Sequence, residues 1–172
     1  MILSRNAFYL ALFLSVVVAL ATLRVFPLGP ELSFPGFDTH LANRPEMFLA
    51  HAFAASAALL LGGFQFIAQL RARMLALHRW MGRLYVLAVL IGGLSGLAIG
   101  IQAIGGPIAA VGFNLLAIFW LVSTFTALWY VRTGNIPAHR RWMIRSFSLT
   151  FAAVTLRIYL LIFGLNGFEY DE

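Results

Sequence analysis

The chain contains 172 residues, of which 62% are hydrophobic and 10% are charged, and its mean hydropathy is +0.90. Soluble domains carry about a quarter charged residues, so this composition excludes an ordinary soluble domain and indicates an integral membrane protein. The formal net charge is +6, and cysteine is absent, which excludes disulfides, thiolate metal sites, iron–sulfur clusters and covalently attached c-type haem.

The first predicted element is an apolar run at 7–28, which follows a short basic start at Arg5. It contains the triplet ALA at 19–21, a pattern typical of a signal-peptidase site. Because the run stays apolar beyond this triplet for long enough to span a bilayer, we expect a retained transmembrane helix. Residues 29–46 follow, and their three prolines and two glycines predict an outer loop at the membrane surface.

Four further apolar runs predict four more membrane spans, because a transmembrane helix needs about 20 mostly apolar residues. These runs cover residues 47–70, 84–105, 108–131 and 146–166. The sequence therefore predicts an all-α integral membrane helical bundle with five transmembrane helices in a single domain, residues 1–172. That domain consists of the additional N-terminal helix at 7–28, the outer loop at 29–46 and a four-helix core at 47–166.

The arginines predict how the bundle lies in the membrane. Eight of the twelve arginines fall in two short stretches, residues 71–83 and 132–145, whereas the link at 105–107 is uncharged and the tail is acidic. Positively charged loops stay in the cytoplasm, so we expect a cytoplasmic N-terminus and an outside C-terminus. This clustering reflects topology and does not indicate nucleic-acid binding. Aromatic residues beside the two stretches, including Tyr85, are expected to anchor the inner interface.

Three polar residues are expected to share a layer in the outer half of the membrane. At about 1.5 Å of rise per residue from the outer end of each span, His51, Asn114 and Arg157 lie about 6, 9 and 13 Å deep. An arginine at that depth costs about 2.5–3.5 kcal/mol on insertion scales, so it normally faces a partner inside the protein. The predicted spans contain no carboxylate. Acidic residues of the outer loop, Asn114 with backbone carbonyls, a bound anion or the outer surface remain as alternative partners for Arg157.

A second group lies at the inner side, where two similar segments, HRWMGR at 78–83 and HRRWMIR at 139–145, precede the third and fifth spans. Both spans start at the cytoplasmic side, so His78 and His139 are predicted to lie at the same depth. The planar guanidinium of arginine suits phosphate and carboxylate groups. The arginines that are candidates to bind anionic groups here are Arg79, Arg83, Arg140 and Arg145.

Two interpretations of these segments stay open. In the first, the arginines contact anionic lipid headgroups at the inner face and hold the orientation of the bundle in the lipid bilayer. In the second, the two histidines are axial ligands of a haem b iron or proton carriers, and the arginines neutralise propionates or a quinone oxygen. The candidate cofactor-binding residues are thus His51, His78, His139, Arg79, Arg83, Arg140, Arg145, Asn114 and Arg157, with His78 and His139 as the candidate metal ligands.

A stripe of small residues on the third span, Gly92, Gly96 and Gly100, predicts close contact with another helix. Packing within the bundle is one explanation. The others are a ligand in the groove and contact with a second chain, either a membrane partner subunit or another copy in a homo-oligomer.

Seven motifs of the chain are distinctive when taken together: His51, GGFQF at 62–66, LHRWMGRLY at 77–85, GGP at 105–107, GFN at 112–114, HRRWMIRS at 139–146 and TLRIYL at 155–160. Over about residues 46–165 they resemble the predicted bacterial membrane proteins grouped as domain-of-unknown-function family 2306. The resemblance implies a multi-pass protein of the bacterial plasma (inner) membrane and brings no established activity. Histidines in two layers are also loosely similar to membrane b-type cytochromes, although the inner histidines here flank the predicted spans.

The sequence thus favours a small plasma-membrane bundle that acts as a haem- or quinone-linked redox or assembly component. The alternatives are an anion- or lipid-binding, transport-related protein and a non-catalytic subunit of a membrane complex. These patterns leave open whether the chain is an enzyme.

Overall fold

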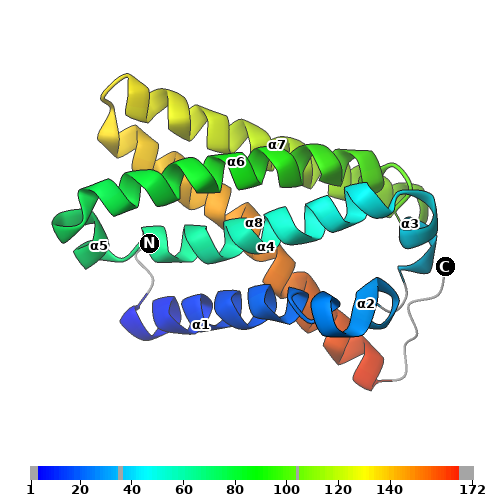
Figure 1. Ribbon diagram of the computed structural model, residues 1–172. Coiled ribbons are helices and arrows are strands. Elements are labelled where there is room, and N and C mark those ends of the chain that lie inside the picture. The colour runs from blue at the N-terminus through cyan, green and yellow to red at the C-terminus, as the bar shows by residue number, and fades with distance from the viewer. Residues whose placement is uncertain (1–3, 35–36, 104, 167–172) are drawn as a thin grey trace.

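The computed structural model describes residues 4–34, 37–103 and 105–166 (Figure 1). Within these ranges the secondary structure is helical and contains no strand. In chain order the helices are α1 (Arg5–Thr22), α2 (Val25–Ser33), α3 (Asp38–Asn43), α4 (Pro45–Gln65), α5 (Ala68–Arg73), α6 (Leu75–Gly100), α7 (Gly106–Arg132) and α8 (Ile136–Leu165).

Five of these helices, α1, α4, α6, α7 and α8, are long and apolar enough to cross a membrane. They contain 18, 21, 26, 27 and 30 residues. A transmembrane helix needs about 17–25 residues, so each of the five can span the hydrocarbon, and the longer ones can extend beyond it. The predicted all-α membrane bundle with five spans is confirmed by these helices.

Four of the long helices form a ring (Figure 1), in which α4 packs on α6, α6 on α7, α7 on α8 and α8 on α4. Helices α6 and α8 therefore lie diagonally across the bundle, and so do α4 and α7. Helix α1 lies outside this ring, against α4 and α8.

One end of the bundle gathers both arginine-rich stretches, residues 71–83 and 132–145, and we call it the arginine-rich end. Figure 1 shows the start of α1, the short helix α5 and the α7–α8 link at this end. Helices α2 and α3 and the last turns of α8 lie at the opposite end. This shared location agrees with the predicted topology, and the assignment of the arginine-rich end to the cytoplasm remains a prediction.

The first two predicted spans and the loop between them differ from the structure. Helix α1 ends at Thr22 rather than at 28, and α4 ends at Gln65 rather than at 70. The predicted loop at 29–46 contains helical residues of α2 and α3. Within α2 the backbone kinks at Gly29, whose φ of 76° lies in the left-handed region that glycine adopts without strain.

Helices α6 and α8 begin earlier than predicted, at Leu75 instead of 84 and at Ile136 instead of 146. Arginine is a good helix former, and its long stem covers apolar surface while its charge reaches water. The arginine-rich segments therefore continue the helices instead of forming loops. As a result, His78 and His139 both lie in the first turns of membrane helices.

The local sequence sets the turn between α7 and α8. Gly134 has a φ of 78°, and the side chain of Asn135 accepts a hydrogen bond from the Ala138 N–H at 3.1 Å. Pro137 occupies the first turn of α8. Backbone N–H groups at the start of a helix have no partner within the helix, so proline, which lacks an N–H, costs no hydrogen bond there. This turn reverses the chain so that His139 returns alongside the end of α7.

Small residues allow side chains of neighbouring helices to approach α4 and α6 closely. A Cβ atom added at Gly62 would lie 2.5 Å from Cδ2 of Phe147 and 2.8 Å from Cε2 of Tyr85. The predicted glycine stripe of α6, Gly92 with Gly96 and Gly100, is buried inside the chain. The packing explanation therefore holds for this stripe, which lies against side chains of the same chain.

A buried network of hydrogen bonds joins α6, α7 and α8. The hydroxyl of Tyr85 lies 2.7 Å from Ser146 Oγ and 2.9 Å from Thr150 Oγ1. Trp120 Nε1 donates to Thr150 Oγ1 at 2.8 Å, and Thr124 Oγ1 lies 2.6 Å from Ser146 Oγ. Polar groups within hydrocarbon need partners inside the protein, so this network fixes α6 against α8 across the bundle. Because Tyr85 is fully buried, its predicted place at the membrane interface is wrong.

Candidate functional site

His78 lies in the first turn of α6 and is partly buried. Its backbone carbonyl accepts a hydrogen bond from Nε2 of Gln65, the last residue of α4, at 3.1 Å. Its side-chain Nδ1 atom is buried and has no hydrogen-bond partner among the residues that the structure describes. A buried polar atom without a partner costs about 1–3 kcal/mol, so this nitrogen is a point at which an added ligand would stabilise the protein.

His139 lies in the first turn of α8, where its ring nitrogen Nδ1 is 2.9 Å from the carbonyl oxygen of Ala127 on α7. A carbonyl only accepts hydrogen bonds, so Nδ1 carries the proton and donates it. The lone pair of Nε2 is then available, which is the arrangement found in histidines that bind metals through Nε2.

Both histidines lie at the arginine-rich end. They lie within electrostatic reach of each other, at the starts of the diagonal helices α6 and α8. Across the described ranges, no group of three or more histidine and acidic residues could hold a metal ion.

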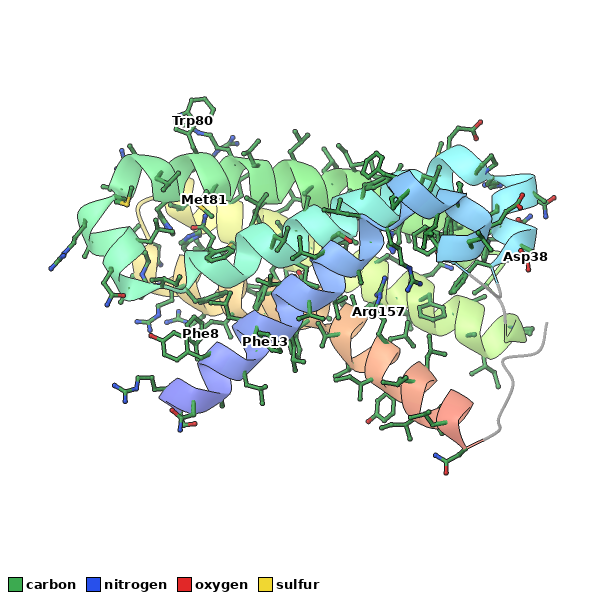
Figure 2. All side chains as sticks on the ribbon, turned by 60° about the horizontal axis from the view of Figure 1, so that its bottom comes forward. Phe8, Phe13, Asp38, Trp80, Met81 and Arg157 are labelled. Atoms are coloured by element: carbon green, nitrogen blue, oxygen red, sulfur yellow. The ribbon has the colours of Figure 1, made fainter. Side chains whose placement is uncertain are left out.

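The two similar segments also fold alike. The guanidinium of Arg83 lies over the ring of Trp80, with Cζ 4.7 Å from the ring centroid. Arg145 lies over Trp142 in the same way, at 4.4 Å. In both pairs the arginine follows the tryptophan by three residues, which places it on the same face of the helix. Figure 2 shows Trp80 pointing away from the bundle. Each pair thus presents a positive charge on an aromatic ring at the arginine-rich end.

The arginines adjacent to the histidines are exposed. Arg79 and Arg140 are exposed and have no hydrogen bond or ion pair within the described part of the chain. With Arg83 and Arg145 they provide four guanidinium groups at the arginine-rich end. All six acidic residues lie elsewhere, in residues 31–46 and in the tail from 169 onward. This end therefore has a positive charge that can attract anionic groups.

His51, in the second turn of α4, contacts the glycine stripe of α6. Its Nδ1 atom donates to the carbonyl oxygen of Gly92 at 2.8 Å. A Cβ atom added at Gly96 would lie 2.9 Å from the same nitrogen. The imidazole therefore fills a space that glycine leaves open, and its hydrogen bond links α4 to α6.

Asn114 fills the next part of the same stripe. Its Nδ2 atom donates to the carbonyl of Ala110 on its own helix at 2.8 Å, and it lies against Gly100, where an added Cβ would be 2.9 Å from Nδ2. His51 and Asn114 thus contact α6 one turn apart, from the diagonal helices α4 and α7. Both have structural partners in the bundle.

Arg157 is exposed in the structure; of the alternatives that the sequence left open for it, the outer surface agrees with this exposure. Its Nη1 atom donates to the carbonyl of Ala153 on the same helix at 3.1 Å, and Arg24 and His51 lie within electrostatic reach. Beyond Val154, α8 diverges from the bundle and most of its side chains are exposed (Figure 2). Arg157 therefore lies outside the enclosed core of the bundle.

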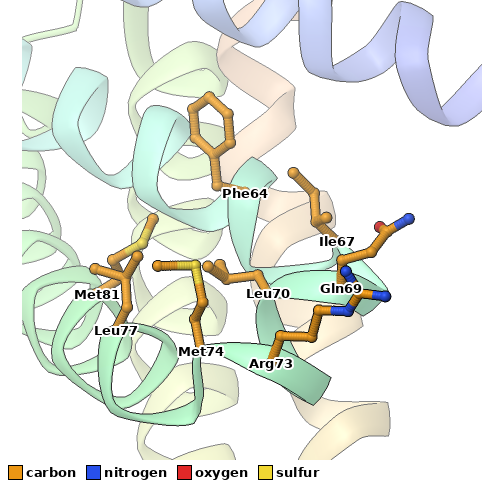
Figure 3. A pocket seen from close by; sticks show the side chains of 8 residues that line it. All are labelled: Phe64, Ile67, Gln69, Leu70, Arg73, Met74, Leu77 and Met81. Carbon is orange, nitrogen blue, oxygen red and sulfur yellow. The ribbon is translucent and has the colours of Figure 1, made fainter.

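A separate pocket of about 340 Å³ lies at the arginine-rich end between the end of α4, α5 and the start of α6 (Figure 3). None of the predicted site residues lines it, and the sequence pattern did not indicate it. The candidate histidine site therefore lies outside this pocket.

The buried hydrogen-bond network, which consists of Tyr85, Trp120, Thr124, Ser146 and Thr150, was also not predicted from the sequence. A signal was present in their spacing. Trp120 and Thr124 are four residues apart on α7, and Ser146 and Thr150 are four residues apart on α8, so each pair lies on one helix face. The sequence does not show that these faces of α7 and α8 contact each other, so only the structure reveals that the five residues form one hydrogen-bonded cluster.

Comparison with known proteins identifies the family. Searches of curated proteins and of solved structures found no significant match. Residues 48–172 match the family described as predicted membrane protein, DUF2306. This match covers most of the chain and includes both histidines of the arginine-rich end. The chain belongs to this family of predicted membrane proteins, domain-of-unknown-function family 2306.

Proposed function

We propose that the chain binds haem b at the arginine-rich end and acts as a redox-linked component of the bacterial inner membrane. The observation that carries this proposal is the pair formed by His78 and His139. Their imidazoles lie within electrostatic reach of each other, at the starts of two helices that are diagonal in the bundle. Histidine is the usual protein ligand of haem iron, and His78 and His139 are the residues that would hold it.

The hydrogen bonds of the two imidazoles support this role. His139 has its Nδ1 proton bound to Ala127, which holds the ring in one orientation and leaves Nε2 as the ligand atom. The Nδ1 atom of His78 is buried without a partner in the described ranges. An iron ion or a propionate oxygen would supply the interaction that this nitrogen lacks.

The charge of the arginine-rich end supports the same cofactor. Haem b carries two propionates, and guanidinium groups at the arginine-rich end can pair with carboxylates in a bidentate geometry. The residues in question are Arg79, Arg83, Arg140 and Arg145. When bound, haem supplies one-electron transfer, for exchange with a quinone or a partner protein. The histidines hold and orient the group, and the arginines neutralise its charge.

The test is an absorption spectrum of the full chain, expressed with added haem precursor and purified in mild detergent. The wild-type protein is expected to show a Soret band and to contain iron. Changing His78→Ala or His139→Ala is expected to remove the band. His40→Phe is the matched control, because His40 lies on α3 at the opposite end and its ring stacks on Phe48, a contact that phenylalanine retains.

Loss of the band through misfolding is distinguished by adding imidazole to the alanine variants. A ligand defect is rescued by free imidazole, whereas an unfolded protein is not. A colourless wild-type preparation without iron, or equal loss of the band in the His40→Phe variant, would reject haem binding by this pair.

The second candidate is a protein that binds anionic groups at the arginine-rich end without a redox cofactor. It is favoured by the two Arg-over-Trp pairs, which fold alike in the two similar segments. A colourless protein that co-purifies with anionic solute or lipid, and loses it in the double variant Arg83→Gln with Arg145→Gln, would favour this candidate over haem binding.

A further inference from the structure

We infer that the pocket between α4, α5 and α6 binds one anionic phospholipid, with an acyl chain in the pocket and the headgroup phosphate at Arg73. This site shares no lining residue with the histidine pair, so it does not depend on haem binding.

The pocket forms because the chain turns twice between α4 and α6. The backbone is extended at Ile67 and leaves the helical region again at Met74, so α5 is a separate short helix between these turns. No residue of α5 is buried. Helix α5 packs against α4 and α6, and a groove beside it stays open toward the surroundings of the bundle.

The groove is apolar inside and positively charged at its edge. Its volume is about 340 Å³. Figure 3 shows the side chains of Leu70, Met74 and Met81 pointing into the space beneath Phe64. The guanidinium of Arg73 lies at the border, beside the amide of Gln69. An acyl chain and a charged headgroup match these two regions.

The physical chemistry of the lining favours a lipid over a peptide or a polar solute. A peptide in this apolar groove would bury backbone N–H and C=O groups without partners, each at a cost of a lost hydrogen bond. An acyl chain has no such groups. The thioether side chains of Met74 and Met81 are flexible and adapt to a chain of variable shape.

The charge at the border selects the headgroup. Arg71 and Arg73 belong to the last turn of α5, and no acidic residue lies between 47 and 168. A phosphodiester with a net negative headgroup, such as phosphatidylglycerol, is therefore attracted more strongly than zwitterionic phosphatidylcholine. The contribution of an arginine near anionic lipid is worth about a fivefold change in affinity.

Native mass spectrometry of the full chain can test this site, after incubation with phosphatidylglycerol or phosphatidylcholine of identical acyl chains. The wild-type protein is expected to retain one phosphatidylglycerol more strongly than phosphatidylcholine. Leu77→Trp should fill the groove and lower retention of both lipids. Leu77 is 42% exposed, so the larger ring does not displace the core. Leu75→Trp is the matched control, because Leu75 is on the same turn, is 49% exposed and does not line the groove.

A second pair of variants tests the headgroup contact. Arg73→Gln is expected to reduce the preference for phosphatidylglycerol about fivefold and leave retention of phosphatidylcholine unchanged. Arg132→Gln removes an exposed arginine from the same end of the bundle and should keep the preference. Equal retention of the two lipids by the wild-type protein, or equal effects of Arg73→Gln and Arg132→Gln, would overturn the site. If the protein contains no haem but still prefers phosphatidylglycerol, the lipid site is supported although the haem proposal fails.

Discussion

At the scale of single residues, the glycines of α4 and α6 decide how near the helices come. Each of these glycines is opposed by a particular side chain: Gly62 by Phe147 and Tyr85, Gly96 by His51, and Gly100 by Asn114. Lipid tails are as apolar as the helix surfaces, so close packing and hydrogen bonds, more than water exclusion, hold membrane helices together. The polar residues His51 and Asn114 serve this packing, and their partners are backbone carbonyls and glycine surfaces.

Gly62→Ala is expected to destabilise the bundle by about 1–3 kcal/mol, because the added methyl group overpacks the core. Its position would be 2.5 Å from Phe147 and 2.8 Å from Tyr85, and the Tyr85 ring is held by two hydrogen bonds. Thermal unfolding in detergent, followed by circular dichroism, measures the change. Gly112→Ala is the control, since a Cβ at Gly112 meets nothing within 4 Å. Equal unfolding temperatures of the two variants would contradict the close contact.

At the scale of elements, the arginine-rich segments behave as helix starts and not as loops. Their arginines extend α6 and α8 toward the aqueous side, and the Arg-over-Trp pairs at Arg83 and Arg145 recur on both helices. Both helices start at the arginine-rich end (Figure 1), and His78 and His139 each lie in the first turn of their helix. The link between α7 and α8 contributes by reversing the chain within a few residues around Gly134.

Gly134→Ala is expected to destabilise the α7–α8 turn by about 1–2 kcal/mol, the cost of a left-handed conformation for a residue with a Cβ. The φ of Gly134 is 78°, and a Cβ there meets nothing within 4 Å, so the backbone conformation is the only source of strain. Comparison with Gly112→Ala isolates this effect, because both sites are sterically open but only Gly134 has a positive φ. Unfolding temperatures in detergent provide the measurement. A Gly134→Ala protein as stable as Gly112→Ala would show that the turn adopts another conformation.

At the scale of the whole molecule, the bundle separates two chemical environments. The arginine-rich end carries the two histidines, the arginines of both similar segments and the apolar groove. The opposite end carries α2, α3 and the acidic residues Glu31, Asp38 and Glu46. By the positive-inside rule, this asymmetry of charge predicts that the arginine-rich end lies in the cytoplasm.

The orientation can be measured because the chain has no cysteine, so a single introduced cysteine is unique. Thr133→Cys places a thiol in the exposed α7–α8 link, and Glu31→Cys places one in the exposed part of α2. In intact cells, a membrane-impermeant maleimide is expected to label the variant at position 31. The variant at position 133 should react only after permeabilisation. The reverse pattern would invert the predicted topology.

The sequence by itself determined the class of the molecule. Its five long apolar runs predicted five membrane helices, and its clustered arginines predicted that both basic stretches lie at one end. Both properties are local, because hydropathy and charge along a segment decide whether it enters the bilayer. The helix starts were less accurate, since an apolar window stops where Arg83 or Arg145 appears while the helical hydrogen bonds continue through it.

Only the tertiary structure decided which polar groups meet and which remain exposed. The bond from His51 to Gly92, the network around Tyr85 and the exposure of Arg157 depend on the rotation and tilt of each helix. These quantities follow from contacts between segments far apart in the chain, such as Gly62 against Phe147. Depth counted along one helix cannot reveal them, because a residue at a given depth can face the bundle or the lipid. The groove beside Arg73 could not be predicted from the sequence pattern either, because it depends on how α4, α5 and α6 pack together.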